Sequence, residues 1–265
     1  MNLQLKTTFA LALASSFLSL TTPLFAANAP AASPAERAKI EEVVHQYLLA
    51  KPEVLVEAMQ TLQRKQAEQA QEVMKETQKN ASKFASALFH QKMDPVVGNP
   101  ASKITVVEFF DYQCPHCIDM GPVIDAIVKA NPNNVRIVFK DFPIRGPASE
   151  MAARAAIAAN LQGKYFPFHL ALLAAPQPLT ADAIMTLAKQ MGLDIPRMKK
   201  DMDANSTTEQ LKADVKLAQD LKLFGTPAFF IGKTALTDNI HGTIHYAPGQ
   251  ISQSQLQDMI DQAAQ

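Results

Sequence analysis

The sequence predicts an α/β protein: a β-sheet domain that carries an inserted helical domain and follows an all-helical N-terminal region. Three observations support this fold class. Residues 53–93 contain neither Gly nor Pro and are rich in Gln, Ala, Lys and Glu, which is typical of a long helix. An apolar run at residues 104–110 begins a strand–helix–strand pattern, which implies two parallel strands joined by a right-handed crossover. A helical stretch at about residues 147–221 then separates this pattern from a further apolar strand at residues 228–231.

Residues 1–26 have the features of a secretory signal peptide. Lys6 supplies the positive charge, and residues 9–20 form an apolar stretch that is too short to span a bilayer. Small residues surround a cleavage site after Ala26 or Ala27, and a membrane anchor is the alternative interpretation. A signal peptide predicts export of the chain to a compartment in which disulfide bonds form.

Residues 27–93 are expected to form a helical oligomerisation region. Ser33 and Glu36 form a capping box at the start of one helix, and Pro52 separates that helix from a longer one. The longer helix carries a thin apolar stripe at Met59, Leu62, Ala70, Val73, Ala81, Phe84 and Leu88. A single helix cannot bury this stripe, and its simplest partner is the same helix of another subunit. The region therefore predicts a homodimer, with a trimer as a second arrangement and a solvated linker helix as the alternative.

Residues 94–265 are expected to form the sheet domain, which begins with a turn-rich boundary at residues 94–100. The expected elements are strand 104–110, helix 115–130, strand 135–140, the helical insertion at about 147–221, strand 228–231, a last strand at 240–245 and a closing helix to about residue 263. The sheet is thus divided between two stretches of chain on either side of the insertion.

Cys114 and Cys117 are the only cysteines, and they stand where the strand at residues 104–110 gives way to a helix. A disulfide across so short a loop contributes little stability, because that contribution grows with loop size. At a helix N-terminus, unpaired N–H groups and the helix dipole favour a thiolate. The thiolate is the attacking species in disulfide exchange, and a second cysteine can resolve the mixed disulfide. The pair therefore predicts a redox site, with an inert local disulfide as the alternative.

The charge balance and the histidines argue against two other kinds of site. The chain has 25 basic and 25 acidic residues and no basic run, which argues against a nucleic-acid partner. His241 and His245 would share a face of the expected last strand, but no third ligand accompanies them, so no metal site is predicted. The redox-active disulfide of Cys114 and Cys117 is expected to work without a cofactor.

Four segments of the sheet domain resemble the thioredoxin superfamily and, within it, the exported DsbA-like proteins. They are residues 107–117 with the Cys-Pro-His-Cys motif, 139–143, 166–169 and 225–229. The helical region in front is similar to that of the oligomeric branch of the family, which includes ScsC- and Com1-like proteins. The resemblance implies a thioredoxin fold with an inserted helical domain. It also implies a cis peptide bond at Pro227 beside the cysteines, where a trans Pro that opens an edge strand is the alternative.

Within the expected site, Cys114 is the exposed nucleophile and Cys117 the resolving thiol. His116 can donate a hydrogen bond or present a charge to the Cys114 thiolate, which makes the disulfide more oxidising. Glu108 shares a face of its strand with apolar residues, and a buried carboxylate there can exchange a proton with Cys117. A solvent-facing His116 and an exposed Glu108 are the alternatives. The residues expected to contact the substrate are Pro115, Gly225 and Thr226.

Together these features resemble an exported thiol–disulfide oxidoreductase that acts on cysteine-containing proteins and is reset by a membrane redox partner. The Pro115-His116 pair resembles the dipeptide of strongly oxidising DsbA, whereas Thr226 and the expected oligomer resemble isomerases. A combined oxidase and isomerase is the first interpretation, and a plain oxidase is the second. From other classes, the cysteines could bind Cu(I) in a metal-tolerance protein, since soft thiolates suit Cu(I). A holdase that binds clients through its front helices is a further alternative.

Overall fold

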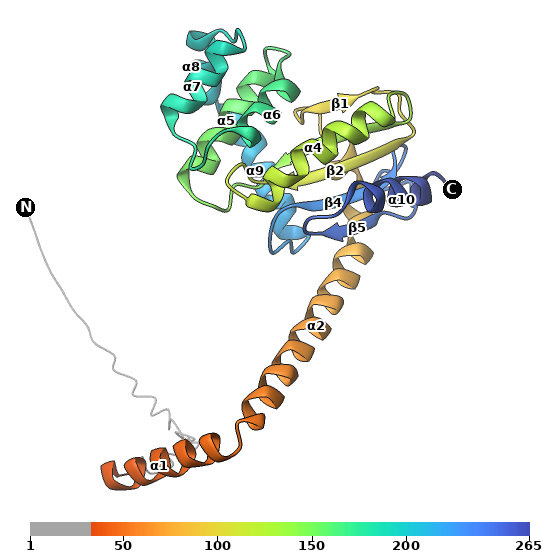
Figure 1. The fold of residues 1–265 in the computed structure, drawn as a ribbon. Coiled ribbons are helices and arrows are strands. Elements are labelled where there is room, and N and C mark those ends of the chain that lie inside the picture. Colours follow the sequence, from red (N-terminus) through yellow and green to blue (C-terminus); the bar gives the residue numbers. More distant parts are fainter. Residues whose placement is uncertain (1–32) are drawn as a thin grey trace, which may run out of the picture. The chain divides into compact units, whose positions relative to one another are not determined.

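The structure, a computed structural model, describes residues 33–265 (Figure 1), so the expected signal peptide lies outside the described residues. The helices are α1 (Pro34–Ala50), α2 (Glu53–Ala81), the 3-10 helix η1 (Ser82–Phe84), α3 (Ala85–Phe89), α4 (Pro115–Ala130), α5 (Pro147–Asn160), α6 (Tyr165–Ala174), α7 (Ala181–Gln190), α8 (Ile195–Met202), α9 (Asn205–Asp220) and α10 (Gln253–Ala264). The strands are β1 (Val96–Gly98), β2 (Ile104–Phe110), β3 (Val135–Asp141), β4 (Ala228–Lys233) and β5 (His245–Pro248). Within residues 33–265, no helix is long and apolar enough to cross a membrane.

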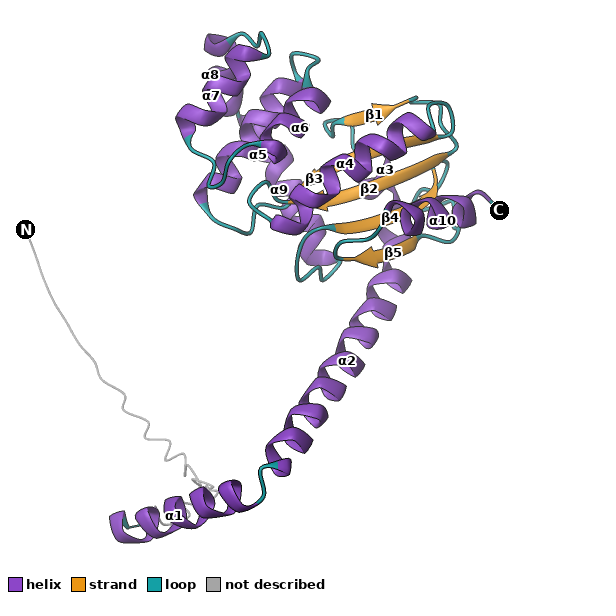
Figure 2. Cartoon of the chain, in the orientation of Figure 1, coloured by secondary structure: helices purple, strands orange, loops and turns teal. Residues whose placement is uncertain are grey.

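One five-stranded sheet with the order β1-β3-β2-β4-β5 forms the centre of the sheet domain (Figure 2). β2 and β3 are parallel, as predicted, and the other neighbouring pairs are antiparallel. The α/β class, with a thioredoxin fold and an inserted helical domain, is therefore confirmed. Two strand predictions are wrong. The three-residue edge strand β1 lies between two prolines in the segment expected to hold only turns, and the last strand is β5 rather than residues 240–245.

The side chains of β2 alternate between two helix-covered faces of the sheet. Ile104, Val106 and Phe110 pack with α4 and α10, whereas Val107 and Phe109 pack with α3 and α9. Every residue of β2 is buried. Because both faces are covered, the strand is held firmly and brings its C-terminal end to the start of α4.

The helices α5 to α9 lie between β3 and β4 in the chain, in the segment where the sequence predicts the insertion (Figure 1). Buried ion pairs join this insertion to the sheet. Lys140 Nζ on β3 lies 3.3 Å from Asp214 Oδ1 on α9 and 2.5 Å from Asp94 Oδ2. The backbone N–H of Asp141 also donates to Asp214 Oδ2 at 3.2 Å. A buried ammonium group requires such partners because removing it from water is costly. The Asp214 contacts hold α9 against β3, and the Asp94 pair holds the segment before β1 there.

The described part of the chain divides into two compact units, residues 33–62 and residues 63–265. In the first unit, α1 begins with the predicted capping box of Ser33 and Glu36 and ends at Ala50, just before Pro52. Nine of the large apolar side chains of this unit are 49–67% exposed: Ile40, Val43, Val44, Tyr47, Leu49, Leu55, Val56, Met59 and Leu62. In α1, Ile40, Val44 and Tyr47 have an i, i+4, i+7 spacing and so lie on one face of the helix, which the sequence analysis did not identify. Both helices of this unit therefore present apolar surface.

The second half of the predicted apolar stripe packs against the sheet domain of the same chain. The expectation that the whole stripe forms one continuous surface that binds another subunit is therefore wrong. Ala81 and Leu88 are fully buried in the core on the α9 side of the sheet. Thr77 is also buried, and its hydroxyl donates to the Leu221 carbonyl at 3.1 Å. That carbonyl is one of those that a helix end leaves without an intrahelical partner. This packing extends the second compact unit well upstream of Asp94, where the sequence analysis began the sheet domain.

Candidate active site

β2 leads directly to the N-terminus of α4, where the two cysteines lie. Cys114 is the N-cap residue of α4 with an extended backbone (φ −84°, ψ 118°), and Pro115 occupies the first helical turn, where no backbone N–H donor is needed. The N–H of Cys117 donates to the Cys114 carbonyl at 3.0 Å, so Cys117 stands one turn into the helix. Both cysteines are free thiols in this structure.

The loop before β4 packs against Cys114. The Thr226–Pro227 peptide bond is cis, as the resemblance implies. The Cys114 thiol donates to the Thr226 carbonyl at 3.2 Å. Because this loop lies over the sulfur, Cys114 is only 1% exposed, which corrects the expectation of an exposed nucleophile. Gly225 has open space where a Cβ atom would stand, which leaves room for a substrate chain beside the site.

The two thiols have opposite electrostatic settings. Hydrogen bonds from the Cys117 side chain, from the Thr226 side chain and from the backbone N–H groups of Cys117 and His116 lower the pKa of Cys114 to about 5, although burial acts in the other direction. Burial, the hydrogen bond to Cys114 and the charge of Glu108 raise the pKa of Cys117 above its ordinary value. At neutral pH, Cys114 is therefore a thiolate and Cys117 a thiol. This asymmetry suits a nucleophile and a resolving cysteine.

Glu108 is buried in the apolar interior on the side of Cys117, as the strand alternation predicts. It is 2% exposed and stands opposite Phe139 of β3 and Phe229 of β4. Its Oε2 atom has no hydrogen-bond partner within the described part of the chain. Burial raises the pKa of Glu108 to about 8. A carboxyl group of this kind can accept or release a proton near neutral pH, and its charge acts on Cys117.

His116 is exposed in the first turn of α4, and its ring contacts a residue that the sequence analysis did not single out. Nδ1 lies 3.0 Å from Oε1 of Gln250. The backbone N–H of His116, and not its ring, lowers the pKa of Cys114. The effect expected of the imidazole on the Cys114 thiolate stays a prediction, and the ring is held by the segment between β5 and α10.

Asp111 holds the turn that leads to Cys114, and the sequence analysis did not assign it to the site. Its carboxylate accepts three hydrogen bonds, from the N–H of Gln113 at 2.7 Å, the N–H of Arg145 at 2.9 Å and the hydroxyl of Ser149 at 2.6 Å. The bond to the N–H two residues later forms an Asx turn, for which an Asp just after a strand is the sequence signal. Asp111 therefore connects the end of β2 to the start of α5.

His169 on α6 supports the same segment from the core. The hydroxyl of Tyr112 lies 2.9 Å from His169 Nδ1. Burial lowers the pKa of His169 to about 3, so the ring is neutral. His169 is therefore a neutral residue of the core and supports the active-site segment from there.

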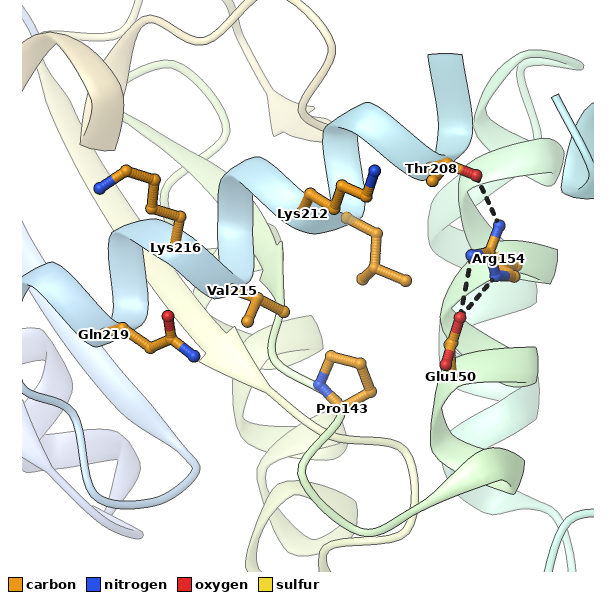
Figure 3. Close-up of a pocket in the computed structure, with 9 residues that line it drawn as sticks. Pro143, Glu150, Arg154, Thr208, Lys212, Val215, Lys216 and Gln219 are labelled. Carbon is orange, nitrogen blue, oxygen red and sulfur yellow. Dashed lines mark hydrogen bonds and ion pairs between the residues drawn. The ribbon is translucent and has the colours of Figure 1, made fainter. Parts of the chain in front are cut away.

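A separate groove lies between α5 and α9, beside Pro143 (Figure 3). Its basic side chains have acidic partners on the same helices. The pairs are Arg154 with Glu150 (2.9 Å), Lys212 with Glu209 (3.3 Å) and Lys216 with Asp220 (2.6 Å). None of the expected site residues lines this groove. The redox site is therefore a surface formed by α4 and the cis-Pro loop and not part of the groove.

We expect the reduced protein to gain stability relative to the oxidised protein as the pH rises from about 5 to about 9. Folding lowers the pKa of Cys114 from 9.0 to about 5. Between these values the unfolded thiol binds a proton that the folded thiolate does not, so unfolding becomes less favourable as the pH rises. The oxidised form lacks this thiol, while buried acids such as Glu108 are common to both forms. Thermal unfolding of both forms from pH 5 to 9 measures the difference, and a difference that stays constant contradicts an acidified Cys114.

Known protein families and structures share this arrangement. A family model described as the DSBA-like thioredoxin domain matches residues 105–261, and one described as the copper resistance protein ScsC N-terminal domain matches residues 36–69. A thioredoxin-like oxidoreductase from Silicibacter pomeroyi DSS-3 is 39% identical, with 68% of this chain and 96% of that chain covered and a TM-score of 0.60. BcfH from Salmonella enterica Typhimurium is 33% identical, with 87% and 97% covered and a TM-score of 0.64.

The curated relatives match over part of their length. The thiol:disulfide interchange protein DsbA of Bordetella parapertussis is 28% identical over 166 residues, which are 58% of this chain and 75% of that protein. The Na(+)/H(+) antiporter NhaA 3 of Salinispora tropica is 29% identical over 160 residues, which are 60% of this chain. This chain spans only 23% of the length of that antiporter. With the cysteine pair at the N-terminus of α4, the cis-Pro loop beside it and the match over residues 105–261, the chain belongs to the family of DsbA-like thioredoxin domains.

Proposed function

We propose that this chain is an exported thiol–disulfide oxidoreductase that forms disulfides in exported cysteine-containing proteins and isomerises incorrect ones. The observation that carries this proposal is an acidified Cys114 at the N-cap of α4, next to a buried Cys117 that stays protonated. A thiolate of low pKa is a good leaving group, so a disulfide at Cys114 opens readily. Stabilisation of this thiolate also favours the reduced form, which makes the disulfide an oxidant.

In oxidation, a substrate thiolate attacks Sγ of Cys114 in the Cys114–Cys117 disulfide. The bond between the two site sulfurs breaks, and Cys117 leaves with the electron pair and takes a proton, for which Glu108 is the neighbouring donor. A second substrate thiolate attacks the substrate sulfur of the mixed disulfide, and Cys114 leaves as a thiolate. Two electrons pass from the substrate to the site, and a membrane redox partner must accept them to restore the disulfide.

In isomerisation, the Cys114 thiolate attacks an incorrect substrate disulfide, forms a mixed disulfide and releases one substrate thiolate. A different substrate thiolate can then attack the substrate sulfur of the mixed disulfide, which forms a new substrate disulfide and releases Cys114 as a thiolate. Alternatively, Cys117 attacks Sγ of Cys114 and releases the reduced substrate, and the Cys114–Cys117 disulfide formed in this step can re-oxidise that substrate by the oxidation steps above. Cys117 must first lose its proton, and Glu108 is the acceptor. The exposed apolar faces of α1 and the start of α2 support assembly into a homodimer, or a trimer, with several sites on one scaffold. A plain oxidase is the alternative, since oxidation needs only one site.

The proposed substrate surface consists of Pro115, Gly225 and Thr226 around the cysteines. The cis bond at Pro227 turns the chain so that neighbouring backbone groups can pair with an extended peptide. Phe224, which is 67% exposed, adds an apolar contact at the start of this loop. Such a surface fits a polypeptide that has not yet buried its own apolar side chains.

The proposed location is the periplasm. The charge and apolar stretch of residues 1–26 support export of the chain. An oxidising compartment suits a site that donates disulfides. The membrane redox partner would act on the same side of the membrane.

Replacing Cys117 with Ser is expected to trap substrates as mixed disulfides on Cys114. The variant keeps the nucleophile but lacks the thiol that releases the substrate. Cys114→Ser is the matched control and is expected to trap none, because the buried Cys117 stays protonated. Alkylation of cells followed by non-reducing electrophoresis and mass spectrometry identifies the complexes. Equal trapping by the two variants, or none with Cys117→Ser, contradicts the proposed function.

Binding of Cu(I) by Cys114 and Cys117 is a second candidate function. The match of residues 36–69 to a domain of a copper resistance protein favours it, as does the preference of Cu(I) for thiolates. The raised pKa of Cys117 opposes it, because a second thiolate is then harder to form. Stoichiometric copper binding by a protein that does not exchange disulfides favours this candidate over the oxidoreductase.

A further inference from the structure

The ring of His116 is held by a residue that lies 134 positions later in the sequence. His116 Nδ1 lies 3.0 Å from Oε1 of Gln250, in the loop between β5 and α10. An amide oxygen can only accept a hydrogen bond, so the proton in this contact belongs to Nδ1. While the contact lasts, that proton is not available to a sulfur atom.

The loop that carries Gln250 is itself attached to the active site. The N–H of Gly249 donates to the carbonyl of Pro227 at 2.7 Å. Gly249 has φ +80°, in the left-handed region that favours glycine. Ser252, two residues after Gln250, caps α10. Because the backbone is fixed on both sides, Gln250 loses little freedom when it binds the ring, and a hydrogen bond between two exposed side chains becomes easier to form.

The sulfur of Cys114 interacts with other groups than the imidazole. Within residues 33–265 these are the Cys117 thiol, Thr226 and the backbone N–H groups of Cys117 and His116. The His116 ring projects from the same helical turn as Cys114, so rotation about its side-chain bonds can bring it to the sulfur once Gln250 releases it. The present contact therefore holds the ring on Gln250.

We propose that Gln250 is a positioning residue that holds the His116 imidazole on the loop before α10, away from the Cys114 sulfur, and so limits the oxidising strength of the site. The inference rests on the proposed function and deepens it. A released ring can donate its N–H to the Cys114 thiolate, which stabilises the reduced form over the disulfide. An isomerase site must also attack incorrect disulfides, and an extremely stable thiolate is a poorer nucleophile. A limit on the stabilisation of the Cys114 thiolate therefore favours isomerisation.

The test is the equilibrium of the full-length protein with glutathione. The site disulfide takes two electrons from two glutathione molecules, which become glutathione disulfide; of the two protons that they release, one binds Cys117 and the other passes to the solvent, because Cys114 stays a thiolate at neutral pH. Alkylation of the protein thiols over a series of glutathione ratios gives the equilibrium constant. Gln250→Ala is expected to shift it about fivefold toward the dithiol, the effect of one net hydrogen bond. Gln253→Ala changes an exposed Gln at the start of α10 and is expected to leave the constant unchanged.

A second pair of variants separates this positioning role from a structural one. In the His116→Ala protein the ring is absent, so addition of Gln250→Ala is expected to leave the constant where His116→Ala put it. An equal shift in both backgrounds, no shift with Gln250→Ala alone, or a shift toward the disulfide overturns the proposal. Failure of the proposed function has a different signature: the wild-type protein equilibrates with glutathione but does not oxidise reduced peptides.

Discussion

Removal of residues 27–62 is expected to give a monomer that oxidises reduced peptides at close to the full-length rate but loses most of its isomerase activity. The cysteines, Glu108 and the cis-Pro loop all lie in the second compact unit, residues 63–265, so the chemistry of one site is retained. The apolar faces expected to join the subunits are removed. A second site on the same scaffold raises the effective concentration at the substrate, with a gain of about 10²–10⁴ in typical cases, so we expect at least about a tenfold loss of isomerase activity.

The position of the truncation matters because the end of α2 and all of α3 belong to the core of the second unit. Ala81, Ala85, Leu88 and Phe89 are 0–2% exposed. Burial of one large apolar side chain such as Leu or Phe contributes about 1.5–3 kcal/mol to the free energy of unfolding. The total free energy of unfolding of a domain is only about 5–15 kcal/mol. A truncation through His90 therefore removes a large part of the stability. We expect that shorter protein to misfold, which makes it unsuitable as a test of assembly.

Light scattering on the truncated protein gives its mass, and two assays give its activities: oxidation of a reduced peptide and refolding of a scrambled protein. The full-length double variant Met59→Glu and Leu62→Glu is a matched control that disrupts the apolar face without shortening the chain. It is expected to separate the two activities in the same way. A truncated protein that remains oligomeric, or a monomer with full isomerase activity, contradicts the proposed role of these helices.

Glu108→Gln is expected to slow release of the mixed disulfide at least about tenfold and to leave its formation nearly unchanged, because general base catalysis contributes at least about 10²-fold in typical cases. Formation uses the Cys114 thiolate, which needs no further proton transfer at neutral pH. Release requires Cys117 to lose its proton inside the protein, and Gln cannot accept it. Stopped-flow measurement of the two steps with a disulfide-containing peptide separates them, and equal slowing of both steps indicates a structural role.

The pH dependence of the release rate distinguishes a proton acceptor at Glu108 from a residue with a purely structural role. The wild-type release rate should rise as the pH passes through about 8, because Glu108 becomes a carboxylate there, and the Gln variant should lack this rise. Folding raises the pKa of Glu108 from 4.5 to about 8, so the folded protein loses stability as the pH rises through this range. Gln has no such loss. The variant should therefore be at least as stable as the wild type at pH 8, which separates slower release from unfolding.

Those parts of the site that depend on neighbours in the chain could be predicted from the sequence. The apolar run of β2, followed by a Cys-Pro pair at a helix start, was enough to put Cys114 at the N-terminus of α4 and Cys117 one turn later. Strand alternation was enough to predict a buried Glu108. The capping box and the Pro52 break at the two ends of α1 follow in the same way from local backbone chemistry. Each of these features depends on a few adjacent residues.

Contacts between distant segments were decided only by the tertiary structure. The carbonyl that accepts the hydrogen bond of Cys114 is 112 residues away in the chain, and Gln250 is 134 residues from the ring it holds. The edge strands β1 and β5 exist where β3 and β4 offer them partners, and packing divided the apolar stripe of α2 between the core and exposed surface. Strand pairing and burial depend on which surfaces meet in the folded chain, and hydrophobic periodicity shows that a surface needs a partner without specifying which one.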